Sequence, residues 1–276
     1  MQNYDKIDNP EILASLFMPP QEEVSKCPEF AENVEFTITD EVTIVCRFYK
    51  ADKDAPTLLY FHGSKESVNK YDPIASKYVE YGVNIMLASY RGYGNSDGSP
   101  GVESMLSDSA VIFKKTAAYL QNHDFTGALF VMGRSLGSAA AVEVAHTFPE
   151  EVKGLIIESG FCNTLPLLEG LGVDVAKFEL SEEDGFQNPQ KIEKIKLPTM
   201  FFHGSRDTLV LPAQAETMQA SSGARNKQFH IIPGAEHGTM IESGGNLYFQ
   251  TIKTFLDTVC GVNNWRKKRK KYSDTK

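Results

Sequence analysis

Short, continuously apolar runs alternate with stretches of helical spacing along most of this 276-residue chain, and this alternation limits the folds open to it. The apolar runs, each bounded by turn residues, lie at 57–61, 83–88, 128–131, 154–158, 199–203 and 229–232. Such runs are typical of strands that are buried on both faces of a parallel sheet. The helical stretches span 73–81, 102–122, 136–146, 211–220 and 246–260. Together they predict right-handed crossovers in a doubly wound α/β fold.

Two further strand-like segments, at residues 35–39 and 42–49, come before these runs and look like an antiparallel pair. They bring the predicted sheet to about eight strands, mostly parallel, with helices on both faces. One connection is longer than the rest, because about forty residues separate the runs that end at 158 and begin at 199. We predict that residues 161–197 form a short cap over the functional site.

The length of the chain suits one domain with a large core. We predict an N-terminal extension at residues 1–30, which is polar apart from a short apolar stretch at 12–18. The domain itself spans residues 31–260. Residues 261–276 form a basic tail that we predict to be disordered, with six consecutive Lys and Arg residues at 266–271.

The pentapeptide G-R-S-L-G at residues 133–137 follows directly on one predicted strand and opens the next helix. A serine in this position sits on a strained turn that lifts its hydroxyl above the sheet. Larger side chains at the two glycine positions would collide with the neighbouring strands and helix. The placement predicts that Ser135 is a nucleophile; the alternative is a tight turn with an incidental serine.

A serine hydroxyl needs a base that takes its proton as it attacks. His237 lies in the sequence P-G-A-E-H-G, after the last predicted strand and before the closing helix. Of the six histidines it alone lies on a glycine-flanked loop at this edge of the sheet. We therefore predict that His237 is the general base rather than a structural histidine.

The acid that orients the histidine should also follow a strand at the same edge. Asp207 meets this condition, since it ends the sequence H-G-S-R-D after the run 199–203. The chain order of Ser135, Asp207 and His237 is the one found in α/β hydrolases. Glu158, at the end of the preceding strand, is the competing acid, and a solvated turn aspartate is the other interpretation of Asp207.

An acyl-transfer site also needs hydrogen-bond donors aimed at the developing oxyanion. We predict two backbone N–H groups for this oxyanion hole. One is that of Leu136, directly after the nucleophile, and the other is that of Ser64, in the loop after the run 57–61.

Five motifs follow one another in a characteristic order: H-G at 62–63, S-Y-R-G-Y-G-N-S-D-G at 89–98, G-R-S-L-G at 133–137, H-G-S-R-D at 203–207 and H-G at 237–238. With them the chain resembles the α/β-hydrolase-domain proteins of the serine-aminopeptidase-like, prolyl-oligopeptidase-like branch, from about residue 42 to 256. The resemblance implies the α/β-hydrolase fold and a catalytic triad. It also implies that the loop 90–98 shapes the site. The branch includes peptidases, acyl hydrolases and protein depalmitoylases, so the substrate stays open.

Two features depart from the pattern of these relatives. Residues 64–67 read S-K-E-S where relatives often carry a glycine-containing loop, which implies an acyl pocket of different shape and charge. The depalmitoylase-like relatives carry an N-terminal cysteine cluster, whereas the first cysteine here is Cys27.

Composition bears on which cofactors, metals and partners the protein can have. The four cysteines, Cys27, Cys46, Cys162 and Cys260, lie far apart without C-x-x-C spacing, so we predict neither a metal site nor disulfides, and no cofactor. The formal charge of −8 includes the basic tail, so the body of the chain is strongly acidic and we expect no nucleic-acid partner. The tail itself is either a solvated end or a site that contacts an anionic membrane weakly, a nucleic acid or a nuclear import receptor.

No apolar run reaches the 18 or so residues of a membrane span, and no signal-peptide pattern is present, so we expect a cytoplasmic protein. The predicted function is that of a serine hydrolase, most consistent with a carboxylic-ester or acyl hydrolase that acts on a small-molecule or acylated substrate. A peptidase of the aminopeptidase type and a non-catalytic scaffold are the alternatives.

Overall fold

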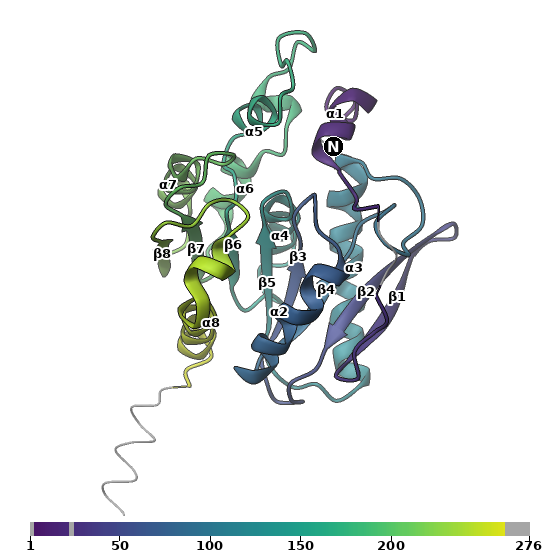
Figure 1. The fold of residues 1–276 in the computed structure, drawn as a ribbon, viewed down its shortest axis with the longest axis vertical. Coiled ribbons are helices and arrows are strands. Elements are labelled where there is room, and N and C mark those ends of the chain that lie inside the picture. The colour runs from purple at the N-terminus through teal and green to yellow at the C-terminus, as the bar shows by residue number, and fades with distance from the viewer. Residues whose placement is uncertain (1–2, 22–24, 263–276) are drawn as a thin grey trace, which may run out of the picture.

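The computed structural model describes residues 3–21 and 25–262, and in it eight strands form one sheet in the order β1-β2-β4-β3-β5-β6-β7-β8 (Figure 1). The strands are β1 (Ala31–Thr39), β2 (Val42–Tyr49), β3 (Thr57–Phe61), β4 (Asn84–Ala88), β5 (Leu129–Arg134), β6 (Leu155–Glu158), β7 (Thr199–Gly204) and β8 (Lys227–Ile232). β2 runs antiparallel to both β1 and β4, and all other neighbours are parallel. The predicted mostly parallel sheet of about eight strands is confirmed.

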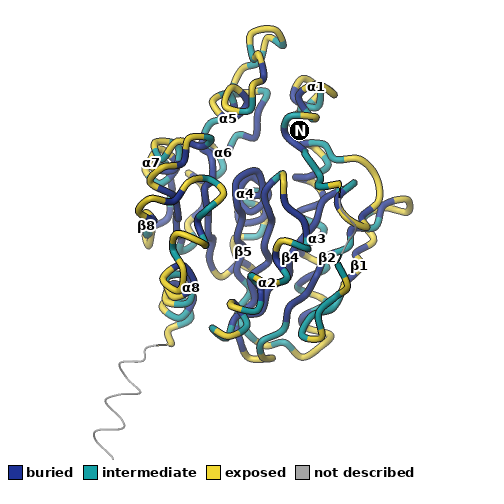
Figure 2. The backbone as a smooth tube through the Cα atoms, viewed as in Figure 1, coloured by how far each residue is buried: buried dark blue, intermediate teal, exposed yellow. Residues whose placement is uncertain are grey.

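Helices cover both faces of the sheet. They are α1 (Pro10–Leu16), α2 (Val68–Glu80), α3 (Val102–Asn122), α4 (Gly137–Thr147), α5 (Thr164–Gly170), α6 (Asn188–Lys194), α7 (Pro212–Ser221) and α8 (Met240–Val259), with a 3-10 turn, η1, at Glu182–Asp184. In β3, Leu58 and Tyr60 pack in the core shared with α2 and α8, while Leu59 and Phe61 pack in the core shared with α3 and α4. All five β3 residues are buried, which explains why its sequence is continuously apolar (Figure 2).

Two helices begin earlier than the sequence predicts. α2 begins at Val68 rather than at residue 73, because Pro73 lies inside the helix and does not start it. α8 begins at Met240 rather than at 246. Its first turn precedes Gly245, whose φ of 50° interrupts the helix. The helical spacing of the sequence therefore begins only after this glycine.

The predicted N-terminal extension contributes a helix near the carboxyl edge of the parallel strands. α1 lies beside α5 at one end of the molecule (Figure 1). Its residues Ile12 and Leu16 are buried in the larger core, together with Phe17. α5, η1 and α6 all fall within residues 161–197, the segment predicted as a cap. Most of the predicted basic tail, residues 263–276, lies outside the described residues.

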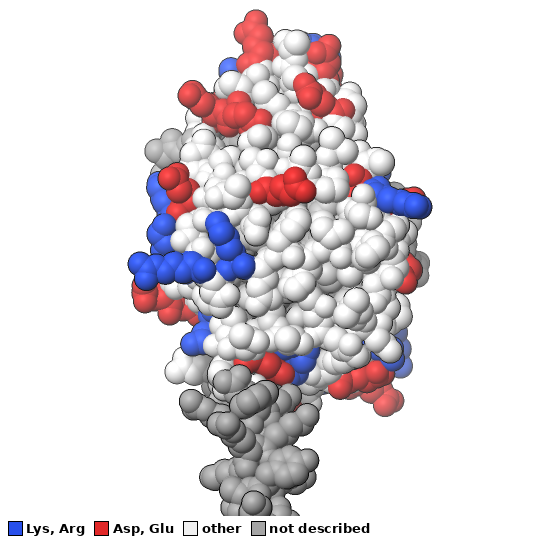
Figure 3. Space-filling model, turned by 90° about the vertical axis from the view of Figure 1, so that its left-hand side faces the viewer, with Lys and Arg blue, Asp and Glu red and all other residues white. Residues whose placement is uncertain are grey.

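Charge is unevenly distributed over the surface. On the face that carries α7, β8 and α8, acidic side chains gather at the end of the molecule near α5, and the middle of the face is largely uncharged (Figure 3).

Candidate active site

Ser135 sits on a strained turn between β5 and α4. Its φ is 52°, in the left-handed region that L residues other than asparagine and aspartate seldom adopt. A Cβ atom on Gly133 would lie 2.3 Å from the carbonyl oxygen of Gly137, and one on Gly137 would lie 2.2 Å from that of Phe61. Both glycines are therefore required for α4 to pack this closely against the sheet, as the sequence predicts.

The structure brings Ser135, His237 and Asp207 together in one hydrogen-bonded row. His237 Nε2 lies 2.8 Å from Ser135 Oγ, and His237 Nδ1 lies 2.8 Å from Asp207 Oδ2. With Nδ1–H donating to the carboxylate, Nε2 is free to accept the proton of the serine hydroxyl. Asp207 is buried, whereas the His237 side chain is 18% exposed and can meet a bound molecule.

Asp207 is fixed by more than its contact with His237. Its Oδ1 accepts hydrogen bonds from the backbone N–H groups of Leu209 and Val210, and its Oδ2 lies 3.3 Å from Nε2 of His203. Burial opposes the charge, but the hydrogen bonds from His203 and His237 win and hold the pKa of Asp207 well below its usual range. The carboxylate is therefore ionised at neutral pH. Sequence reasoning did not assign His203 to the site, although it opens the H-G-S-R-D motif.

Glu158, the competing acid, belongs to a different set of contacts. It is fully buried and accepts hydrogen bonds from the hydroxyls of Tyr248 and Tyr60 at 2.7 and 3.2 Å. Its Oε1 lies 3.2 Å from Nε of Arg134. Asp207 and not Glu158 is the carboxylate that contacts His237.

The two predicted oxyanion donors both line the pocket that contains Ser135. Among the described residues, the backbone N–H groups of Ser64 and Leu136 have no hydrogen-bond acceptor. The loop 90–98 supports the first of them, because the hydroxyl of Tyr93 donates to the carbonyl oxygen of Ser64 at 2.7 Å. The hydroxyl of Tyr90 donates to the carbonyl oxygen of His62 at 2.6 Å. This loop therefore shapes the site through the strand-to-loop segment after β3.

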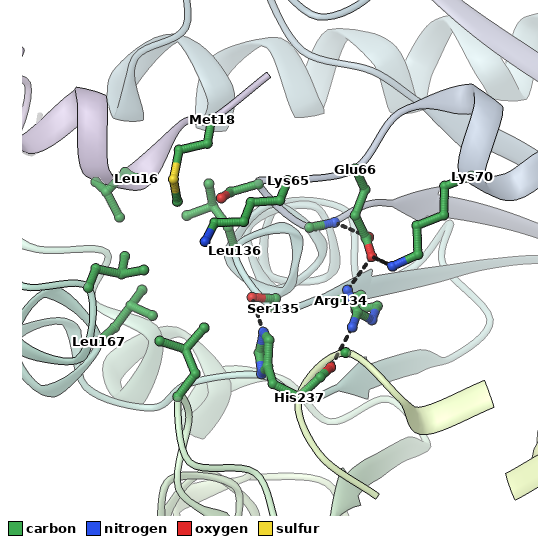
Figure 4. A pocket seen from close by; sticks show the side chains of 15 residues that line it. Leu16, Met18, Lys65, Glu66, Lys70, Arg134, Ser135, Leu136, Leu167 and His237 are labelled. Atoms are coloured by element: carbon green, nitrogen blue, oxygen red, sulfur yellow. Dashed lines mark hydrogen bonds and ion pairs between the residues drawn. The ribbon is translucent and has the colours of Figure 1, made fainter. Parts of the chain in front are cut away.

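The pocket in front of Ser135 has a volume of about 160 Å³ and two unlike walls (Figure 4). One wall is aliphatic and is formed by Leu16, Met18, Leu136, Leu167, Leu171 and Leu209. The other is charged and is formed by Lys65, Glu66, Lys70 and Arg134. Leu16 and Met18 come from the N-terminal segment, which sequence reasoning did not connect with the site. The apolar stretch at 12–18 was the signal for them.

A buried ion network lies under the charged wall. Arg134 contacts the carboxylates of Glu66 and Glu158 and donates a hydrogen bond to the backbone carbonyl of His237. Glu66 also accepts from the backbone N–H of Gly63 and from Lys70 Nζ, at 2.8 and 2.7 Å. The network thus joins the loop after β3, the nucleophile turn and the histidine loop.

The charges in this network balance one another. Burial raises the pKa of Glu66, but the positive charges of Arg134 and Lys70 outweigh this effect and hold that pKa well below its usual range. Glu66 is therefore anionic, and it shares Arg134 with Glu158. Sequence reasoning did not detect this network, although it noted the unusual S-K-E-S loop that supplies Glu66.

Two negative observations concern only the part of the chain that the structure describes. Within residues 3–21 and 25–262, no group of three or more His, Cys, Asp or Glu side chains is arranged to hold a metal ion. Within the same ranges, no helix has the length and apolar character needed to cross a membrane.

Comparison with known proteins places these features in a family. The family model described as serine aminopeptidase, S33, matches residues 52–178 and 187–244, a span that includes Ser135, Asp207 and His237. Protein bem46 of Schizosaccharomyces pombe is 30% identical over 235 residues, which cover 82% of this chain and 76% of that protein. The α/β-hydrolase domain-containing protein WAV2 of Arabidopsis thaliana is 26% identical and covers 82% of this chain and 78% of its own length.

Solved structures share the fold at low sequence identity. The esterase Pf2001 of Pyrococcus furiosus superposes with a TM-score of 0.70 at 17% identity, over 87% of this chain and 98% of its own. Est1E of Butyrivibrio proteoclasticus, solved with ferulic acid, superposes with a TM-score of 0.67 at 17% identity, over 83% and 99% of the two chains. The predicted α/β-hydrolase fold is confirmed.

Proposed function

Because this chain belongs to the α/β-hydrolase family described as serine aminopeptidase, S33, we propose that it is a serine hydrolase that acts through an acyl-enzyme on Ser135. The observation that carries the proposal is the row of two 2.8 Å contacts from Ser135 through His237 to Asp207. A buried, ionised carboxylate behind a histidine that faces a serine hydroxyl is the arrangement that activates serine for attack on a carbonyl.

In the first step Ser135 Oγ attacks the carbonyl carbon of the substrate while His237 Nε2 takes the hydroxyl proton. Asp207 keeps Nδ1 protonated before the attack and stabilises the imidazolium that forms. The oxyanion that develops on the carbonyl oxygen would accept hydrogen bonds from the backbone N–H groups of Ser64 and Leu136.

In the second step the imidazolium gives its proton to the leaving group, and the acyl group stays on Ser135. A water molecule then attacks the acyl-enzyme, with His237 again acting as base, and releases the carboxylic acid. The aliphatic wall of the pocket would hold an apolar acyl chain during both steps. Leu167 and Leu171, from the segment that we predict to be a cap, belong to that wall.

Charge favours an ester or thioester over a peptide with a free amino terminus. An aminopeptidase holds the ammonium group of its substrate, for which a carboxylate is the natural partner. Among the described residues that line this pocket, Glu66 is the one carboxylate, and it is already bonded to Arg134 and Lys70. Lys65 adds a further positive charge on the same wall.

The proposal is tested by labelling the purified protein with a fluorophosphonate, beside the variant Ser135→Ala, and by measuring turnover of p-nitrophenyl esters of increasing chain length. We expect the wild type to be labelled and the variant to be neither labelled nor active. A folded wild-type protein that is not labelled and hydrolyses none of the esters would contradict the proposal and favour a non-catalytic scaffold.

A further inference from the structure

Two lysines on the charged wall of the pocket differ in their electrostatic surroundings. Lys70 Nζ lies 2.7 Å from Glu66 Oε1, so the charge of Lys70 is neutralised. Lys65 forms no ion pair with any described residue. In Figure 4, Lys70 points to Glu66, whereas Lys65 points away from it, towards the aliphatic side of the pocket.

The other charges of this wall leave Lys65 uncompensated. Arg134 and Lys70 carry two positive charges, and Glu66 and Glu158 carry two negative ones. Asp207, the carboxylate behind His237, is buried and bonded to that histidine. A single ammonium group next to Ser135 therefore has no anionic partner in the described protein.

This positive charge is a local feature. The whole chain has a formal charge of −8, and acidic side chains gather on the surface near α5, at the same end as the pocket (Figure 3). Because the surrounding surface is acidic, a lone cation raises the concentration of an anionic ligand only in its immediate vicinity. Lys65 also directly follows Ser64, whose backbone N–H we assign to the oxyanion hole, so it lies close to the position of the scissile carbonyl.

Building on the proposed function, we propose that Lys65 binds an anionic group of the substrate, so that the enzyme prefers an ester or thioester with a carboxylate or phosphate a few bonds from the scissile carbonyl. The substrate is then amphipathic, with its apolar part against the aliphatic wall and its anionic group at the ammonium of Lys65. A flexible lysine suits this role because it offers a point charge without a fixed hydrogen-bonding geometry.

The test compares esters that differ only in the presence of a charge. Mono-p-nitrophenyl adipate and p-nitrophenyl hexanoate share a six-carbon acyl chain, and only the first carries an acyl-side carboxylate. The pair 4-hexanoyloxybenzoate and its methyl ester places the charge on the leaving-group side instead. For each pair, the ratio of the kcat/KM values for charged and neutral esters is measured in the wild type, Lys65→Met and Lys65→Glu.

We expect Lys65→Met to lower this ratio about fivefold for one of the two pairs, because an exposed ion pair contributes about that factor, and Lys65→Glu to lower it further. The ratio for the wild type should also fall as the salt concentration is raised from about 20 mM to about 500 mM, since salt screens exposed charges. The pair that responds identifies the side of the substrate that carries the anion.

Lys77→Met is the matched control, because it removes an exposed lysine charge, paired with Glu80, that does not line the pocket. Its ratio should stay within about twofold of the wild-type ratio. Because the Lys65 side chain is exposed, both Lys65 variants should unfold at the wild-type temperature.

Fluorophosphonate labelling separates failure of this inference from failure of the proposed function. If Ser135 is labelled and the neutral esters are hydrolysed, but the ratio is unchanged in Lys65→Met for both pairs, Lys65 does not bind an anion. An equal loss of activity on charged and neutral esters would also overturn the inference. Absence of both labelling and turnover would overturn the proposed function together with it.

Discussion

At the scale of single residues, the site depends on two side chains that are held by several contacts each. Ser135 adopts a φ of 52°, which the packing of Gly133 and Gly137 enforces. Asp207 is held by two backbone N–H groups and two histidines, so its carboxylate has no freedom to turn away from His237. Such surroundings keep reacting groups in position before a substrate arrives.

The substitution Asp207→Asn tests which acid supports the histidine. The amide cannot fix the Nδ1–H tautomer or stabilise the imidazolium, so we expect kcat to fall by about 10³–10⁴-fold, as in other serine hydrolases. Steady-state turnover of a p-nitrophenyl ester and the thermal unfolding midpoint would be measured together.

Glu158→Gln is the comparison for this substitution. It leaves the contacts of His237 with Ser135 and Asp207 intact but removes the carboxylate charge that pairs with the buried Arg134. We expect it to lower the unfolding midpoint more than Asp207→Asn does, and to reduce kcat far less. The opposite pattern, with activity lost only in a stably folded Glu158→Gln protein, would assign the acid to Glu158.

At the scale of elements, the pocket is assembled from segments that are far apart in the chain. α1 and the residues after it supply Leu16 and Met18, the loop after β3 supplies Lys65, and α5 supplies Leu167. The strands position the triad, since β5, β7 and β8 all end at the same edge of the sheet. The triad residues therefore follow the ends of strands, whereas the wall residues named here lie on helices and loops outside the sheet.

The substitution Met18→Trp tests the role of the N-terminal segment. A larger side chain at this half-buried position should fill part of the aliphatic side of the pocket. We expect the optimal acyl chain of p-nitrophenyl esters to become shorter by about two carbons or more, because each buried methylene contributes about 0.8 kcal/mol. Leu247→Trp is the control, since Leu247 is 59% exposed and does not line the pocket. An unchanged optimum in Met18→Trp would show that the acyl chain lies elsewhere.

At the scale of the whole molecule, the sequence predicts the sheet well because six of its eight strands coincide with continuous apolar segments. The strands β3, β4, β6 and β7 are buried at every position, so their residues are mostly apolar and the sequence indicates them directly. The triad follows from the same regularity, because a parallel sheet brings loops after successive strands to one edge.

The features that were not predicted depend on contacts between distant segments. The strand order places β4 between β2 and β3, which no local pattern specifies. The ion network joins Glu66, Arg134 and Glu158, whose pairing depends on how the loop after β3 packs on the nucleophile turn. The wall residues Leu16, at the end of α1, and Met18, just after it, reach the site only through tertiary packing.

The buried ion network also makes the stability of the whole molecule depend on pH. The pKa of Glu66 in the folded protein is lowered by Arg134 and Lys70 despite its burial, whereas an unfolded glutamate titrates near about 4.3. The unfolded state therefore binds a proton first as pH falls, so the stabilisation by Glu66 is complete above about pH 5 and is lost on further acidification. Glu66→Gln removes this contribution and should cost about 3 kcal/mol of unfolding free energy at neutral pH.

The measurement is the difference in unfolding free energy between the wild type and Glu66→Gln, obtained by urea denaturation at several pH values from about 7 to about 3.5. We expect the difference to be largest at neutral pH and to shrink as the solution is acidified, because only the wild type loses the ionised carboxylate. Glu80→Gln is the control, since Glu80 pairs with Lys77 at the surface and its effect should be small throughout. A difference that stays constant or grows on acidification would mean that Glu66 is not the anion that holds Arg134 in place.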